Sequence, residues 1–132
     1  MADFEIPGSL RYTLEDEWAR VEDDRVTIGV TDYAQNQLGD VVFVELPSVG
    51  KRIVKGEPFG VIESVKAVAD LYAPLTGEVV EANGELGGQP ELVNADCYGD
   101  GWMLVVLVED TQELDELLDA DAYAAHIEER SE

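Results

Sequence analysis

Turn-forming residues interrupt the middle of this sequence so often that no long helix fits there. From Pro47 to about residue 93, short runs of β-branched residues alternate with the segments SVGK, KGEP, PLTGE and ANGELGG. Clusters of Gly, Pro, Asn and Ser such as these are typical of tight turns. Many short strands joined by frequent turns favour a sandwich or barrel-like fold. We therefore expect a mainly β protein.

The segment before these turns predicts two strands with a short helix between them. DRVTIGVT alternates apolar and polar residues in the pattern of a half-buried strand. Thr31 can then cap a short helix near 32–38, and Gly39 is placed to end it. DVVFVELP resumes strand character and stops at Pro47.

The last third of the chain predicts a central strand and a helical tail. GWMLVVLVED is apolar on both faces, which is typical of a strand in the middle of a sheet. A C-terminal helical tail is expected over about 111–130, with Asp110 and Glu113 near the spacing of a capping box and Asp121 capping a second stretch. The apolar residues expected to pack this tail on the β-core are Leu114, Leu117, Leu118, Tyr123 and Ile127.

Length and composition indicate a single compact domain over residues 1–132. The apolar stretches have the length of strands, far short of the roughly 20 residues that a membrane-spanning helix needs. The start, MADFEIPGSL, lacks the basic and apolar regions of a secretory signal. A lone cysteine, Cys97, leaves no internal disulfide and favours a cytoplasmic protein.

The chain is strongly acidic, with 30 Asp and Glu against 8 Lys and Arg and a net charge of −22. Such a field disfavours nucleic acid and anionic membranes as partners. The carboxylates are spread along the chain, so we interpret them as a solvated coat suited to a salt-rich, halophilic cytoplasm, where the Debye length falls to roughly 3 Å at 1 M salt. A docking surface for basic partners is the alternative.

Residues that commonly carry catalysis are few. His126, the only histidine, falls on the predicted C-terminal helix, and Cys97 has no histidine near it in sequence that could generate a thiolate. NADCYGDGWMLV begins like a calcium loop but has Val105 where a bidentate glutamate is needed. GELGGQP lacks the context of a phosphate-binding loop. We therefore predict a non-catalytic protein without a metal site.

Lys66 stands out within GVIESVKAVADLYAPLTGEV, because the chain has only three lysines. A weak repeat with a period of 27 residues relates GKRIVKGEPF to GEVVEANGEL, and it places Lys66 on a hairpin, about 60–75, between two similar halves. The nearby carboxylates of Glu63 and Asp70 disfavour the neutral amine that a Schiff base needs. A lysine at an exposed tip suits acylation instead. An ordinary surface lysine that balances these two carboxylates is the alternative.

Three segments, TIGVTDYAQNQLGDVVFVELPSVG, ESVKAVADLYAPLTGEV and NADCYGDGWM, follow one another in an order that resembles the H proteins of glycine cleavage systems. The resemblance extends from about Tyr12 to Tyr123. It implies a barrel-sandwich hybrid of the lipoyl/biotinyl (hammerhead) type with C-terminal helices. It also implies lipoic acid in amide linkage to Lys66, with Glu63 in the hairpin that a lipoate-attaching enzyme recognises.

The resemblance further implies a shuttle that carries the aminomethyl group of glycine. Its partners would be a pyridoxal-phosphate-dependent glycine decarboxylase, a tetrahydrofolate-dependent aminomethyltransferase and dihydrolipoyl dehydrogenase. A free amine on the loaded arm would lead to its breakdown by water, and carboxylates in a closed cleft would keep that amine protonated. By motif position these carboxylates are Glu17 and Asp70, with Glu15 as a further candidate.

Two positions depart from the family pattern, which usually has His where this chain has Asp16 and commonly Pro where it has Cys97. Other classes of carrier or interaction protein remain open. An acyl-carrying lipoyl domain of a 2-oxoacid dehydrogenase usually has Asp before the lysine, and a biotin carrier has Met on both sides, whereas Val65 and Ala67 flank Lys66. A lipoate-relay or sulfur-metabolism relative and an unmodified interaction module are further alternatives.

Overall fold

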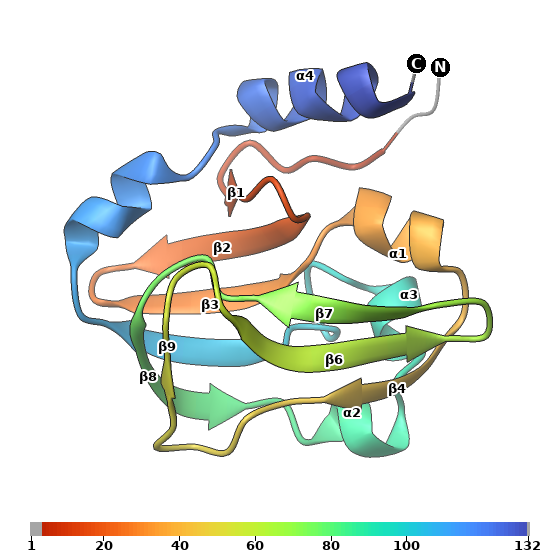
Figure 1. Ribbon diagram of the computed structural model, residues 1–132, viewed down its shortest axis with the longest axis horizontal. Coiled ribbons are helices and arrows are strands. Elements are labelled where there is room, and N and C mark those ends of the chain that lie inside the picture. Colours follow the sequence, from red (N-terminus) through yellow and green to blue (C-terminus); the bar gives the residue numbers. More distant parts are fainter. Residues whose placement is uncertain (1–3, 132) are drawn as a thin grey trace.

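The computed structural model describes residues 4–131, within which nine strands form two antiparallel sheets (Figure 1). The larger sheet has the order β1-β2-β3-β9-β8-β5, and the smaller has the order β4-β6-β7. The strands are β1 (Arg11–Tyr12), β2 (Glu17–Glu22), β3 (Arg25–Val30), β4 (Val41–Glu45), β5 (Arg52–Ile53), β6 (Pro58–Ser64), β7 (Val68–Tyr72), β8 (Gly77–Ala82) and β9 (Leu104–Val108). This architecture confirms the predicted mainly β fold.

The helices lie around the edges of the two sheets (Figure 1). They are α1 (Asp32–Leu38), α2 (Glu85–Gly88), α3 (Leu92–Ala95), the 3-10 helix η1 (Thr111–Glu116) and α4 (Ala120–Ser131). None of the helices within residues 4–131 has the length and hydropathy needed to cross a membrane.

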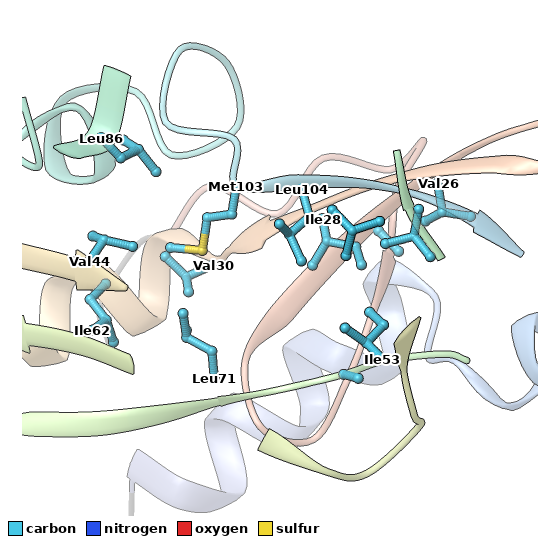
Figure 2. Close-up of a cluster of buried hydrophobic side chains, with 14 of the residues drawn as sticks. Val26, Ile28, Val30, Val44, Ile53, Ile62, Leu71, Leu86, Met103 and Leu104 are labelled. Atoms are coloured by element: carbon cyan, nitrogen blue, oxygen red, sulfur yellow. The ribbon is translucent and has the colours of Figure 1, made fainter. Parts of the chain in front are cut away.

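The main core lies between the two sheets. Alternate residues of β3 point into it, as the sequence pattern predicts, and Val26 and Ile28 are fully buried. In Figure 2, Val30 of β3 lies near Leu71 and Ile62 of the smaller sheet, while Val26 and Ile28 lie toward Ile53. β9 pairs with β3 on one side and β8 on the other, so its predicted central position is confirmed.

A second buried cluster packs under α4. Tyr12 of β1 stacks on Tyr123 of α4 with ring centroids 4.7 Å apart, and Trp18, Tyr33 and Ile127 belong to the same cluster. Both Tyr123 and Ile127 therefore lie on the buried side of the tail, as predicted. This cluster joins the C-terminal helix to the first strands and to α1.

The helix α1 begins and ends where the sequence predicts. The Thr31 hydroxyl accepts a hydrogen bond from the Ala34 amide at 3.2 Å, which satisfies one of the free N–H groups of the first turn. Gly39 follows the last helical residue with φ +78° and ψ −155°, a conformation that almost only glycine adopts. The chain can therefore turn directly into β4.

The predicted caps of the C-terminal tail are partly wrong. Asp110 does cap η1, but the Glu113 carboxylate accepts from the Thr76 amide and hydroxyl, at 2.7 and 3.1 Å, so no capping box forms. The cap of α4 is Asp119 rather than Asp121, since its Oδ1 accepts from the Ala122 amide at 2.8 Å. The reason lies elsewhere in the fold: Leu118 pairs with Tyr12 through two backbone hydrogen bonds, which keep the chain extended up to that residue.

The proposed internal repeat holds only in its first half. The two related segments form β5 and β8, which pair with each other through Arg52↔Glu78 and Ile53↔Gly77. The second halves differ, because Phe59 lies in strand β6 whereas its counterpart Leu86 lies in helix α2. The segment ANGELGG, read as a turn, therefore contains a short helix that buries Leu86.

Candidate functional site

Lys66 lies at the tip of the hairpin formed by β6 and β7. The strands pair up to Glu63↔Val68, and the Ser64 amide donates to the Ala67 carbonyl at 2.8 Å. Val65 and Lys66 are the central residues of the turn, and both side chains are exposed. The sequence places the lysine on a hairpin, and the structure agrees.

Ser64 organises this turn, although sequence reasoning overlooked it. Its side chain is buried, and its hydroxyl accepts hydrogen bonds from the amides of Lys66 and Ala67, at 3.3 and 3.1 Å. The Val65 amide donates to the Asp40 carbonyl at 3.0 Å, which ties the tip to the residue before β4. A serine two residues before the lysine is a signal for this kind of side-chain turn, so Ser64 could have been identified.

The Lys66 side chain runs along the C-terminal end of α1. A Cβ placed on Gly39 would lie 3.6 Å from its Cε and 4.0 Å from its Cδ, so the lysine stem passes directly over this glycine. Three ion pairs form within residues 4–131, namely Arg52–Glu109, Lys55–Glu116 and Arg130–Asp16. Since Lys66 takes part in none of them, its amine is accessible for amide formation.

A cleft of about 180 Å³, here called the arm cleft, lies between α1, β7 and the turn before β2. Apolar side chains of α1 and the small sheet line it, including Ala34, Leu38 and Ile62. Leu38 precedes Gly39, so α1 connects the arm cleft to the lysine tip. The three carboxyl residues predicted for a cleft line it together: Glu15, Glu17 and Asp70.

Glu17 is the buried member of this group, with 2% of its surface exposed. The Thr13 hydroxyl donates to its Oε1 at 2.7 Å, and the Tyr72 amide donates to its Oε2 at 3.2 Å. Burial nevertheless dominates and raises the pKa of Glu17 to about 8. The Glu17 carboxyl therefore carries a proton at neutral pH, whereas the side chains of Glu15 and Asp70 are exposed to solvent.

Asp16, which departs from the family pattern, also lines the arm cleft, together with Arg130 of α4. Its φ of +73° is a conformation in which Asp is better tolerated than most residues. Arg130 donates to both of its carboxylate oxygens, at 2.6 and 2.9 Å. Sequence reasoning missed Arg130 because it lies 114 residues from Asp16.

Cys97 and His126 lie outside the arm cleft. Burial raises the pKa of the Cys97 thiol to about 12, so little of it is thiolate at neutral pH. His126 Nε2 lies 3.3 Å from the Leu14 carbonyl oxygen. Within residues 4–131, no three His, Cys, Asp or Glu side chains are arranged to hold a metal ion.

Comparisons with known proteins point to one family. The family model described as "Glycine cleavage H-protein" matches residues 10–130. The chain is 58% identical to the glycine cleavage system H protein of Brevibacillus brevis over 125 residues, which cover 95% of this chain and 99% of that protein. It is 53% identical to the probable glycine cleavage system H protein of Haloarcula marismortui over 125 residues, which cover 95% and 98% of the two chains.

A solved structure shares the fold. The crystal structure of a glycine cleavage system H protein from Mycobacterium marinum matches with a TM-score of 0.82 and 39% sequence identity, over 91% of this chain and 97% of that one. The family model covers most of the chain, and relatives above half identity align almost from end to end. The chain therefore belongs to the glycine cleavage H-protein family.

Proposed function

We propose that this chain is the lipoyl-bearing carrier of a glycine cleavage system, with lipoic acid in amide linkage to Lys66. The observation that carries the proposal is the path from an exposed lysine at a fixed tip, along Gly39 and α1, to the acidic arm cleft. When attached, the lipoyl group supplies a strained disulfide that takes up and releases the aminomethyl cargo by thiol chemistry. The chain then acts as a carrier and not as a catalyst.

The hairpin gives the attaching enzyme a defined target. Ser64 and the Asp40 carbonyl fix the backbone of the tip, so the Lys66 amine is presented from a rigid support. Glu63 pairs with Val68 on one side and with Phe43 of β4 on the other, and both of these apolar neighbours are exposed. The Glu63 carboxylate therefore lies between two exposed apolar side chains and close to the lysine. A lipoate-attaching enzyme can recognise this combination.

The arm cleft suits the cationic amine of the loaded arm. The exposed carboxylates of Glu15 and Asp70 attract an ammonium group, and the buried Glu17 carboxyl is ready to ionise when a positive charge arrives beside it. An amine held as ammonium keeps no free lone pair, so it does not help to expel the thiolate. The apolar walls formed by Ala34, Leu38 and neighbouring residues exclude water.

The partners proposed for this carrier are the pyridoxal-phosphate-dependent glycine decarboxylase, the tetrahydrofolate-dependent aminomethyltransferase, dihydrolipoyl dehydrogenase and a lipoate-attaching enzyme, all in the cytoplasm. A tethered arm presents its reactive end to each of them at high effective concentration. One tip therefore serves several active sites in turn.

Intact mass and peptide mapping of protein from its native host test the proposal. We expect one lipoyl group, and we expect it on the peptide that contains Lys66. Lys66→Arg removes the attachment site and should abolish the mass increase, whereas the matched control Lys55→Arg, at a lysine paired with Glu116, should retain it. An unmodified Lys66 in cells that are degrading glycine would contradict the proposal.

A further inference from the structure

The end of α4 is fastened to the rim of the arm cleft by a bidentate ion pair. Arg130 Nη1 donates to Asp16 Oδ1 at 2.6 Å, and Nη2 donates to Oδ2 at 2.9 Å. Two parallel hydrogen bonds of this kind fix the relative orientation of the two groups as well as their distance. Asp16 and Arg130 both line the arm cleft, so the fastening lies at the site itself.

This ion pair is more protected from solvent than the comparable pair between Arg52 and Glu109. The exposed fractions of the Arg130 and Asp16 side chains are 34% and 13%, against 60% and 44% for Arg52 and Glu109. Both pairs are bidentate. Exposed pairs contribute little and are screened by salt, whereas partly buried pairs are screened less. The exposed Arg52–Glu109 pair can therefore serve as the control for experiments on the Asp16–Arg130 pair.

Further contacts tie the same two residues to α1. Asp16 Oδ1 also accepts from the Tyr123 hydroxyl at 2.9 Å, and that hydroxyl lies 2.7 Å from Thr31 Oγ1, the cap of α1. The Arg130 guanidinium lies over the ring of Tyr33 in α1, 4.7 Å from its centroid. The turn before β2, α1 and α4 are therefore held together at one corner of the arm cleft.

The ion pair at this corner also determines which acidic side chains of the cleft are left for a ligand. Its lining contains four acidic side chains and a single basic one, Arg130. Because Arg130 engages Asp16, it leaves Glu15, Glu17 and Asp70 for a cationic ligand. Removing the guanidinium would leave Asp16 partly buried without its cation and would release the end of α4 from the rim.

We propose that Asp16 and Arg130 form a latch that holds α4 against the arm cleft and slows the loss of bound cargo to water. This inference rests on the proposed function, because it concerns the arm attached to Lys66. Asp16 and Arg130 act as positioning residues: they hold the end of α4 at the rim of the cleft, and the carboxyl groups beside them contact the cargo. Asp16, where this chain departs from the family pattern, is then part of the latch.

Cargo lifetime is the first test. Lipoylated protein is loaded by glycine decarboxylase and separated from it, and the spontaneous release of ammonia is followed without aminomethyltransferase. We expect release to be roughly threefold to tenfold faster in Arg130→Ala and in Asp16→Asn, the range that one partly buried ion pair can account for. Arg130→Lys keeps the charge without the bidentate geometry and should be intermediate. The control Arg52→Ala should match the parent.

Hydrogen exchange of the unmodified protein is the second test, since it needs neither lipoate nor cargo. Arg130→Ala should speed amide exchange at the C-terminal end of α4 and around Asp16, and Arg52→Ala should not. Unchanged cargo release in Arg130→Ala overturns the latch, even if exchange increases, because α4 would then be anchored without shielding the cleft. Equal acceleration of release by Arg52→Ala also overturns it, since the effect would then be one of net charge.

The two tests keep the proposals distinct. If the parent protein never accepts lipoate at Lys66, the proposed function fails. If the parent is lipoylated and loaded but Arg130→Ala holds its cargo as long, only the latch fails.

Discussion

The side chain of Lys66 lies over Gly39, at the point where α1 ends and the chain turns into β4. The Gly39 backbone, with φ +78° and ψ −155°, favours glycine. A Cβ there would lie 3.6 Å from the Lys66 Cε, an ordinary van der Waals contact, so only a larger side chain would displace the lysine stem. The end of α1 and the path of the Lys66 side chain thus meet at the same residue.

Gly39→Leu should therefore impair lipoylation as well as stability. The unfavourable backbone should lower the free energy of unfolding by about 1–3 kcal/mol, and the new side chain should displace the Lys66 stem and slow lipoate attachment several-fold. The control is Gly56→Leu, because Gly56 also has a positive φ, +84°, but has open space around it. Denaturant unfolding and mass spectrometry of Lys66 measure the two effects. Equal attachment rates in the two variants would refute the prediction.

Ser64→Ala should loosen the hairpin tip. The variant loses the two hydrogen bonds that the serine hydroxyl accepts from the turn amides, so we expect a loss of about 0.5–1.5 kcal/mol in the free energy of unfolding. Lipoate attachment should show a raised KM for the protein with less change in kcat, because the tip is no longer held in one conformation. Ser48→Ala, at an exposed serine, is the control. An unchanged KM would show that the backbone hydrogen bonds to the Ala67 and Asp40 carbonyls hold the tip without the serine hydroxyl.

Glu17→Gln should change how stability depends on pH. The folded protein raises the pKa of Glu17 from 4.5 to about 8. Between these values the folded state holds a proton that the unfolded state has lost, so the free energy of unfolding falls as pH rises from about 4.5 to 8. The total fall from this residue is on the order of a few kcal/mol.

Glutamine does not titrate, so Glu17→Gln should remove this part of the slope and should be the more stable protein near pH 8. Denaturant unfolding across the pH range measures this slope. Glu45→Gln, at an exposed glutamate of β4, should keep the parent slope. Identical slopes in Glu17→Gln and the parent would mean that Glu17 is ionised in the folded protein.

The double variant Glu17→Gln with Asp70→Asn should shorten the lifetime of the loaded arm. Both residues line the arm cleft, and without them the cargo amine loses the groups that favour its ammonium form. We expect ammonia release in the absence of aminomethyltransferase to be about tenfold faster, as the loss of one or two charge-assisted hydrogen bonds implies. Glu78→Gln with Glu81→Gln alters two exposed glutamates of β8 and is the control. An unchanged release rate would exclude the two residues from protection of the cargo.

Local signals made some elements predictable from sequence. α1 is fixed by Thr31 and Gly39 at its two ends, and these lie next to it in the chain. The central position of β9 follows from its apolar character on both faces. The start of α4 could not be read in the same way, because it depends on the pairing of Leu118 with Tyr12, which is distant in sequence.

The residues of the candidate site also differ in how far the sequence predicts them. Lys66 and its hairpin follow from the sequence, whereas the carboxyl residues of the cleft were identified through family resemblance. The raised pKa of Glu17 could not be predicted, since it results from burial where segments far apart in the chain meet, and it persists although the amide of the β7 residue Tyr72 donates to the carboxyl and opposes the shift. The same holds for Arg130, whose role depends on where the last helical turn meets Asp16.

The fixed tip of the hairpin has a kinetic consequence. The amides of Ser64 and Val65 donate to the Ala67 and Asp40 carbonyls, so we expect the base of the proposed arm to keep its position when a partner approaches. All of the search then falls to rotations about single bonds in the Lys66 side chain and its attachment, which take picoseconds to nanoseconds, whereas loop rearrangements extend to microseconds. Transfer between partners should therefore be limited by how long each complex lasts, and not by how quickly the arm finds its target.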